Sequence, residues 1–210
     1  NNLIIYGVSY SPDYPVVQNN YDVTWNGAGD IVVTKLNAAG SVVLASTYVG
    51  GAADDGINFD GQEFSAGNLK WNYGDQNRGE VVVDAQNNIY VVSCTKSFDF
   101  PVTAGAPQSS NGGNQDGCMF KLNSNCQNLI YSTYVGGVSD DACYSLDVAA
   151  DGSVYAAGGT MSNNFPATTG TIHSTYQGGL FDGFLVHLNA LGTQFLQSGF
   201  LGTPGDDQVY

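Results

Sequence analysis

Apolar and polar residues alternate along short segments of this chain, and each such segment ends in a turn sequence. The segments are 3–9, 31–36 and 42–49 in the N-terminal part, and 80–84, 89–95, 118–122 and 129–135 in the middle part. Alternation with a period of two is typical of β-strands that bury one face. The intervening Asp84–Asn88 and Leu122–Cys126 have the Asx and glycine chemistry of hairpin turns. The pattern predicts an all-β chain of antiparallel hairpins.

One string of residues returns three times in the same order: a Leu-Asn pair, an aromatic strand, a glycine turn and a pair of aspartates. The copies begin at Leu36, Leu122 and Leu188 and end at Asp54-Asp55, Asp140-Asp141 and Asp206-Asp207. Val83 and Val148, like Tyr90 and Tyr155, are 65 residues apart. Repetition at a fixed period indicates copies of one supersecondary unit. The first interval is longer because an insertion lies between Asp55 and Val81.

Four antiparallel strands in each repeat of about 65 residues, joined as a meander, are typical of a β-propeller blade. A parallel solenoid is the alternative, but its coils are shorter and need no hairpin turns. We expect a partial blade in 1–55 (strands two to four), a complete blade in 56–139 with an insertion at 56–80, a complete blade in 140–205, and the first strand of a further blade in 206–210. Because about four blades is the usual minimum for closure, we expect a fragment, an incomplete ring, or chains that complete one another's blade as a polymer.

Composition and charge narrow the classes of function. Tyrosine is abundant at 13 residues, whereas Lys and Arg together number 5, a balance that favours strands over helices. The 19 acidic residues give a net charge of −14, which excludes phosphate-rich partners such as nucleic acid. No apolar stretch reaches the length of a membrane span. The acidic surface is typical of a soluble protein.

The four cysteines, Cys94, Cys118, Cys126 and Cys143, lie in or next to the middle repeat and have no counterparts in the other repeats. An even number confined to one repeat predicts two local disulfides, formed in an oxidising compartment, with three connectivities open. The alternative is four buried free thiols. A zinc site has less support because no C-x-x-C motif or neighbouring histidine accompanies the cysteines.

Each aspartate doublet follows a glycine turn, where carboxylates and backbone carbonyls together can bind calcium. The candidate metal ligands are Asp54, Asp140 and Asp206. In the alternative interpretation, one aspartate of each doublet caps the turn through backbone amides while the other is solvated. The second interpretation is favoured because calcium sites gather more oxygen ligands than one doublet provides.

Catalytic motifs are absent from the sequence: it has no G-x-S-x-G, no H-E-x-x-H and no phosphate-binding loop. The two histidines, His173 and His187, have no nucleophile beside them in sequence. We therefore expect no enzymatic activity. A glycan-active enzyme that uses a pair of acidic residues at the mouth of the propeller is a third hypothesis.

The insertion is the best candidate for a ligand-binding site, because loops rather than blades diversify binding on repeat scaffolds. It carries Asp60, Phe64, Trp71 and Tyr73. Aromatic side chains stack on sugars or apolar surfaces, and carboxylates accept hydrogen bonds. These residues predict a lectin-like site for a glycan or a protein; the alternative is a flap whose aromatic residues pack on their own blade.

Several segments together resemble the SBBP repeat, a β-propeller repeat of bacterial secreted and surface proteins. They are Tyr131–Gly137, the Asp doublets, Val148–Tyr155, Phe165-Pro166 and Phe184–Asn189. The resemblance covers nearly the whole chain apart from the insertion, and it implies an extracellular or cell-surface location, as in type IX secretion substrates of the Bacteroidetes. It brings no catalytic residues. The expected function is a non-catalytic module for adhesion, surface-fibre structure or display, with partners among its own copies, neighbouring blades, surface glycans or proteins.

Overall fold

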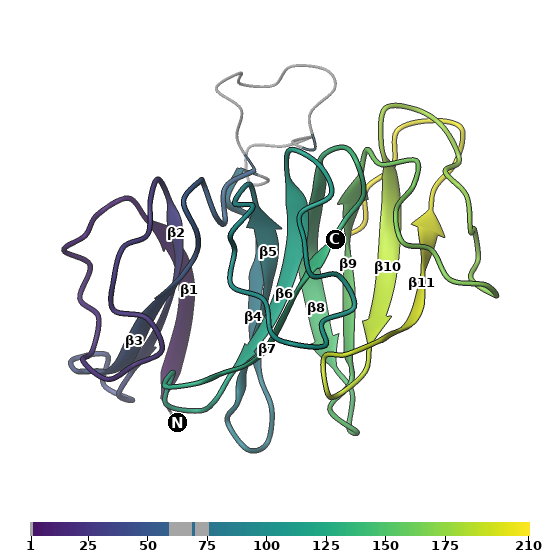
Figure 1. The fold of residues 1–210 in the computed structure, drawn as a ribbon. Coiled ribbons are helices and arrows are strands. Elements are labelled where there is room, and N and C mark those ends of the chain that lie inside the picture. The colour runs from purple at the N-terminus through teal and green to yellow at the C-terminus, as the bar shows by residue number, and fades with distance from the viewer. Residues whose placement is uncertain (1, 59–68, 70–75) are drawn as a thin grey trace.

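A computed structural model describes residues 2–58, 69 and 76–210 and shows an all-β protein (Figure 1). In this part of the chain, eleven antiparallel strands form three sheets. The sheets lie side by side in the order of the sequence and do not close into a ring (Figure 1). None of the described residues belongs to a helix long and apolar enough to cross a membrane.

Within each sheet the strands are neighbours in sequence order, as a meander requires. The first sheet contains β1 (Leu3–Ser9), β2 (Asp30–Leu36) and β3 (Val43–Val49). The second contains β4 (Glu80–Val83), β5 (Ile89–Thr95), β6 (Asp116–Leu122) and β7 (Leu129–Val135). The third contains β8 (Asp141–Val148), β9 (Val154–Thr160), β10 (Asp182–Leu188) and β11 (Phe195–Leu201). The predicted spans of β1, β5 and β7 are confirmed. The other four predicted segments correspond to β2, β3, β4 and β6 and differ from them by one or two residues at an end.

The strand registers show which positions of the three sheets are equivalent. The equivalent pairs are Leu3 with Leu36, Ile89 with Leu122, and Val154 with Leu188. β1, β5 and β9 are therefore equivalent second strands. In the second and third sheets, one side of the second strand pairs with the third strand and the other side pairs with a first strand. In the first sheet, β2 pairs with one side of β1, and no described strand pairs with the other, which we call the free side of β1.

The first strand of the second sheet consists of two pieces. Asp55 forms a β-bridge with Thr95, and β4 pairs with the other half of β5. In the third sheet, β8 covers both halves continuously, with a bulge between Cys143 and Ser145. The predicted strand 80–84 is therefore only the second half of the first strand, because the insertion leaves the sheet at the position of this bulge. The Asn58 N–H donates to Gln76 O at 2.8 Å and closes the base of the insertion.

The Leu-Asn pair has the same structural role in every repeat: its asparagine caps the hairpin turn between the last two strands. The Oδ1 atoms of the three asparagines accept backbone N–H groups four residues later, at 2.8 Å in each case: Asn37 from Ser41, Asn123 from Gln127 and Asn189 from Thr193. This explains why the pair recurs at the end of each third strand.

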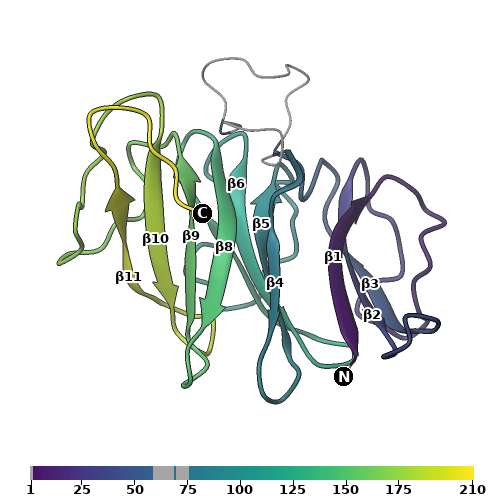
Figure 2. The same ribbon diagram turned by 180° about the vertical axis from the view of Figure 1, so that it is seen from behind.

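Neighbouring sheets lie side by side, as the view from behind shows (Figure 2). Apolar side chains pack between them. Buried residues between the first and second sheets include Ile31, Val33, Val91 and Phe120; those between the second and third include Tyr90, Met119, Leu146 and Phe184. Successive residues of β5 thus contact the first sheet and the third sheet in turn, because side chains alternate between the two faces of a pleated strand. Burial on both faces makes the second sheet the centre of the molecule.

The disulfide prediction is wrong: all four cysteines are free and buried. Cys118 pairs with Ser93, so Cys94 points to the opposite face of the second sheet. Burial raises the pKa of Cys94 to about 12 and that of Cys126 to about 11, which keeps both as neutral thiols. The cysteines pack as small apolar side chains.

Candidate functional site

The most distinctive polar arrangement is built around Asp55, where the first and second sheets meet. One carboxylate oxygen, Oδ2, accepts the Gly51 N–H at 2.7 Å and the Ser97 hydroxyl at 2.9 Å. The other oxygen accepts the Thr95 hydroxyl. The aspartate thus caps the glycine turn that leaves one sheet and binds two hydroxyls of the next. We call this arrangement a joint.

The second joint, between the second and third sheets, repeats the turn cap and the serine bond around Asp141. Its Oδ2 accepts the Gly137 N–H at 2.7 Å and the Ser162 hydroxyl at 2.7 Å. The turn-capping half of this interpretation is therefore confirmed for Asp55 and Asp141, the second member of each doublet. The first member is not merely solvated in the first joint, because Asp54 Oδ1 accepts the Gly29 N–H at 3.1 Å. The serines and threonines of the joints belong to no motif that the sequence analysis found. Their equivalence is visible only from the pairing of the strands.

Each joint also brings a second carboxyl group close to the first. A Cβ atom placed on Gly136 would lie 2.7 Å from Asp116 Oδ1 and 2.7 Å from Asp141 Oδ2, so both side chains flank this glycine. Burial raises the pKa of Asp141 to about 8 and that of Asp116 to about 6. The negative charge of Asp116 raises the pKa of Asp141 further.

The first joint repeats this carboxyl pair with Asp30 and Asp55 on either side of Gly50. Burial raises the pKa of Asp55 to about 7 and that of Asp30 to about 6. In the two pairs, the buried Oδ1 atoms of Asp30, Asp116 and Asp141 have no hydrogen-bond partner. The pairs are consequently sites where protonation is favoured.

The proposed metal ligands lie in three separate places. Asp54 Oδ1 accepts the Gly29 N–H at 3.1 Å, and Asp206 Oδ1 accepts the Leu180 N–H at 2.6 Å. The backbone carbonyl of Asp140 accepts the Met161 N–H at 2.9 Å. Across residues 2–58, 69 and 76–210, no group of three or more His, Cys, Asp or Glu side chains is placed to hold a metal ion.

The first sheet carries one half of a joint. Ser9, Thr95 and Thr160 are equivalent because they pair with Asp30, Asp116 and Asp182. Ser11 lies two residues after Ser9, as Ser97 and Ser162 lie two residues after their threonines. Ser9 and Ser11 bond locally: the Ser11 N–H donates to Ser9 Oγ at 3.2 Å. The hydroxyl half of a joint is present without its aspartate.

The C-terminal segment carries the other half. Asp207 Oδ2 accepts the Thr203 N–H at 2.7 Å, as Asp55 and Asp141 accept the N–H four residues before them. The Asp207 N–H donates to Phe181 O at 2.9 Å, which repeats the bonds from Asp55 to Gly29 and from Asp141 to Gln115. The aspartate half of a joint is present here, and the Thr203 hydroxyl donates to Asp207 Oδ2 at 2.9 Å in place of hydroxyls from a neighbouring sheet.

Residues 207–210 continue over the third sheet as β8 begins over the second. The Val209 N–H donates to Gly158 O at 3.3 Å. The Tyr210 ring stacks on Tyr144 with a centroid distance of 5.2 Å, and the Arg78 guanidinium lies 4.2 Å from the centroid of the Tyr210 ring. Stacking and cation–π contacts hold the Tyr210 ring in place.

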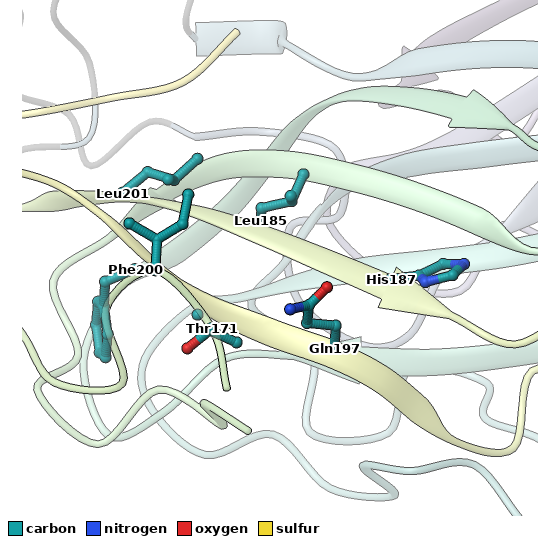
Figure 3. A pocket seen from close by; sticks show the side chains of 8 residues that line it. Thr171, Leu185, His187, Gln197, Phe200 and Leu201 are labelled. Atoms are coloured by element: carbon teal, nitrogen blue, oxygen red, sulfur yellow. The ribbon is translucent and has the colours of Figure 1, made fainter. Parts of the chain in front are cut away.

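The outer face of the third sheet is open. Tyr155 is 39% exposed, whereas its equivalent in the second sheet, Tyr90, is covered by the third sheet. Leu185 is exposed, while its equivalent Met119 is buried. A cavity of about 100 Å³ on this face is lined by Thr171, Ile172, Leu185, His187, Gln197, Gly199, Phe200 and Leu201 (Figure 3). The face that buries apolar residues inside the molecule is thus unpartnered here.

His187 lies beside a serine and an aspartate that sequence analysis did not connect with it. Its Nε2 lies 2.9 Å from Ser153 Oγ, and this hydroxyl donates to Asp151 Oδ1 at 2.6 Å. Because the serine proton is directed to the aspartate, the imidazole is not placed to accept it. The Tyr155 ring stacks on the imidazole at 4.0 Å. His173 lies elsewhere, in a β-bridge with Phe200.

The proposed ligand-binding residues Asp60, Phe64, Trp71 and Tyr73 lie outside the described residues. Leu69, in the same insertion, is described and buried. Its carbonyl accepts the Asn58 amide at 2.8 Å and the Tyr144 hydroxyl at 2.7 Å. Its side chain packs with Cys94, Ala142, Tyr144 and Phe181. One residue of the insertion is therefore fixed between the second and third sheets.

No model of a known protein family matches the chain, and no curated protein matches it. Its function must therefore be inferred from the arrangement of the residues described above.

Proposed function

We propose that the chain is a non-catalytic, extracellular β-propeller-type repeat module that serves as a structural unit in adhesion, surface fibres or display. The joint carries this proposal, because the same polar residues connect one sheet to the next at two places. In this interpretation each sheet is a blade, and the boundaries of the blades fall near residues 55, 139 and 205.

The use of the polar side chains supports a structural role. The aspartates, serines and threonines of the joints are buried and donate to or accept from one another. The hydroxyl of Ser153 is bonded to Asp151, and Asn37, Asn123 and Asn189 cap turns. Groups that could perform chemistry in another setting are here engaged in joining strands and sheets.

The surface location rests on the resemblance to SBBP repeats and on the composition. A net charge of −14 keeps a protein soluble at high concentration. Immunogold labelling of intact source cells with an antibody to the purified chain tests the location. We expect gold on the cell surface or on fibres; label found only inside sectioned cells would contradict the proposal.

The absence of catalysis is tested separately by incubating the purified chain with a panel of polysaccharides. We expect no product to be released from any of them.

A second candidate function is glycan or protein binding by the insertion. The anchoring of its base favours this function: Gln115 Nε2 donates to Asn58 Oδ1 at 2.9 Å, and Asn58 in turn holds the Leu69 carbonyl. A non-repeated segment on a fixed base is a common way to present a binding loop on a repeat scaffold.

If the insertion binds glycans, Trp71→Ala is expected to reduce binding on a glycan array at least tenfold, because an aromatic anchor contributes on the order of 2 kcal/mol to such contacts. Trp25→Ala is the matched control: Trp25 lies in a loop of the first sheet, and its indole N–H donates to Ala28 O at 2.8 Å. Equal loss of binding in both variants, or no binding by the parent chain, would contradict a lectin function.

A further inference from the structure

We propose that copies of this chain associate head to tail, with residues 206–210 of one copy pairing along the free side of β1 of the next, where β8 pairs with β9 in the third sheet. This inference rests on the proposed structural role and specifies its partner as a second copy. The two half-joints carry the inference, since the first sheet presents the hydroxyl residues Ser9 and Ser11 and the segment after β11 presents the aspartate that would fit them.

The acceptor is the free side of β1. A groove of about 380 Å³ lies along it, lined by Tyr6, Gly7, Val8, Tyr10, Ile57 and Asn77. In the third sheet the corresponding side of β9 is occupied by β8, and in the second sheet the corresponding side of β5 is occupied by Asp55 and β4. A free strand edge presents unpaired backbone groups that favour strand addition.

The internal joints fix the register of the added strand. Asp141 pairs with Thr160 and Cys143 pairs with Gly158 in the third sheet. The same register places Asp207 of one copy opposite Ser9 of the next, and Val209 opposite Gly7. The hydroxyls of Ser9 and Ser11 then reach the Asp207 carboxylate, as those of Thr95 and Ser97 reach Asp55.

A further bond completes the joint. The Ala53 N–H donates to Ser97 Oγ, and the Ser139 N–H donates to Ser162 Oγ, both at 2.9 Å. Gly205 is the equivalent residue in the C-terminal segment, and its N–H is directed to Thr203 Oγ1 at a longer 3.2 Å. In the assembly the Gly205 N–H would donate to Ser11 Oγ of the next copy.

The faces that would meet are apolar on both sides. Leu3 is 52% exposed on the first sheet, whereas its equivalents Ile89 and Val154 are buried against the preceding sheet. Opposite it would lie the outer face of the third sheet, with Tyr155 and the cavity lined by Ile172 and Leu185 (Figure 3). This packing repeats the contact between the second and third sheets.

The interface is heterologous, because it joins different surfaces of two identical chains. Such contacts continue into filaments unless rotation closes a ring. Each copy carries a net charge of −14, so repulsion between copies opposes assembly at low salt. Added monovalent salt is expected to promote association, since it screens this repulsion.

Sedimentation velocity of the purified full chain, measured as its concentration and the salt concentration are raised, is the primary test. We expect species that grow with both variables. Ile172→Glu is expected to shift association to at least tenfold higher protein concentration, because it places a charge in the apolar contact. Leu191→Glu is the matched control: Ile172 is 73% exposed and Leu191 is 76% exposed, but Leu191 lies in a hairpin turn outside the proposed contact.

A mixing experiment distinguishes strand exchange from non-specific aggregation. A chain lacking residues 206–210 keeps only the acceptor, and Ser11→Asp keeps only the donor, because a carboxylate at this position would face Asp207. Each variant alone is expected to be monomeric, and their mixture is expected to form dimers and nothing larger. Circular dichroism melting of each variant confirms that it folds.

The inference is overturned if the parent chain stays monomeric at high protein and salt concentration, or if the two variants do not dimerise on mixing. Equal effects of Ile172→Glu and Leu191→Glu would also overturn it. A monomeric chain that is nevertheless found on the cell surface would leave the proposed function standing, so the two failures are distinguishable.

Discussion

Raising the pH from about 5 to about 9 is expected to lower the free energy of unfolding by on the order of 5 kcal/mol. The cause lies in the two buried carboxyl pairs. Burial raises the pKa of Asp141 to about 8 and that of Asp55 to about 7, whereas an unfolded aspartate titrates near pH 4. Above these folded-state pKa values the chain must hold carboxylates in a buried site.

The direction of the effect follows from proton binding. Between about pH 4 and pH 8 the folded chain binds more protons at Asp141 and Asp55 than the unfolded chain does. The stabilisation is therefore fully present below the unfolded pKa and is lost as the pH rises through the folded pKa. Urea unfolding followed by circular dichroism at several pH values measures it.

Asp141→Asn distinguishes the contribution of the joint to the pH dependence of stability from the contribution of the protein's overall charge. The amide cannot titrate, and its oxygen still accepts the Gly137 N–H and the Ser162 hydroxyl. We expect the variant to be more stable than the parent at about pH 9 and to show a flatter pH profile. Asp147→Asn, at an exposed position of β8, is expected to leave the profile unchanged. Stability that increases with pH in the parent would contradict protonated pairs.

The strands were predictable from the sequence because their determinants are local. In β5 and β7, alternating apolar residues and adjacent Asx or glycine turns specify both the strand and its ends. The interrupted first strand of the second sheet was not predictable, since its two pieces, around Asp55 and at β4, are brought together only by pairing with β5.

The candidate site was only partly predictable. Repetition drew attention to the aspartate doublets, but their hydroxyl partners come from distant strands: Ser97 is 42 residues from Asp55, and Ser162 is 21 residues from Asp141. Such contacts depend on register, which local sequence does not reveal. The disulfide prediction was wrong for a related reason. The even number of cysteines suggested pairing, whereas the alternation of β5 and β6 separates Cys94 from Cys118.

Gly158→Ala is expected to destabilise the folded chain by about 3 kcal/mol, which corresponds to a fall of roughly 10 °C in Tm for a domain of this size. Gly158 lies in β9, where the third sheet packs on the second. A Cβ there would overlap the Ala142 carbonyl oxygen and lie 2.8 Å from Phe184 Cζ. The oxygen belongs to the backbone of β8, and Phe184 is fully buried, so neither can move without disturbing the core.

Gly7→Ala is the matched control, because Gly7 and Gly158 are equivalent positions of β1 and β9. A Cβ on Gly7 has Val32 Cγ2 as its nearest neighbour, at 3.7 Å, which is an ordinary contact. The difference arises because β8 covers β9, whereas the free side of β1 is open. We therefore expect Gly7→Ala to change Tm by no more than roughly 3 °C. Thermal unfolding of dilute, monomeric samples measures the Tm of both variants. A similar loss of Tm in both would contradict this explanation, because it would show that the covering strand β8 is not what makes the position sensitive.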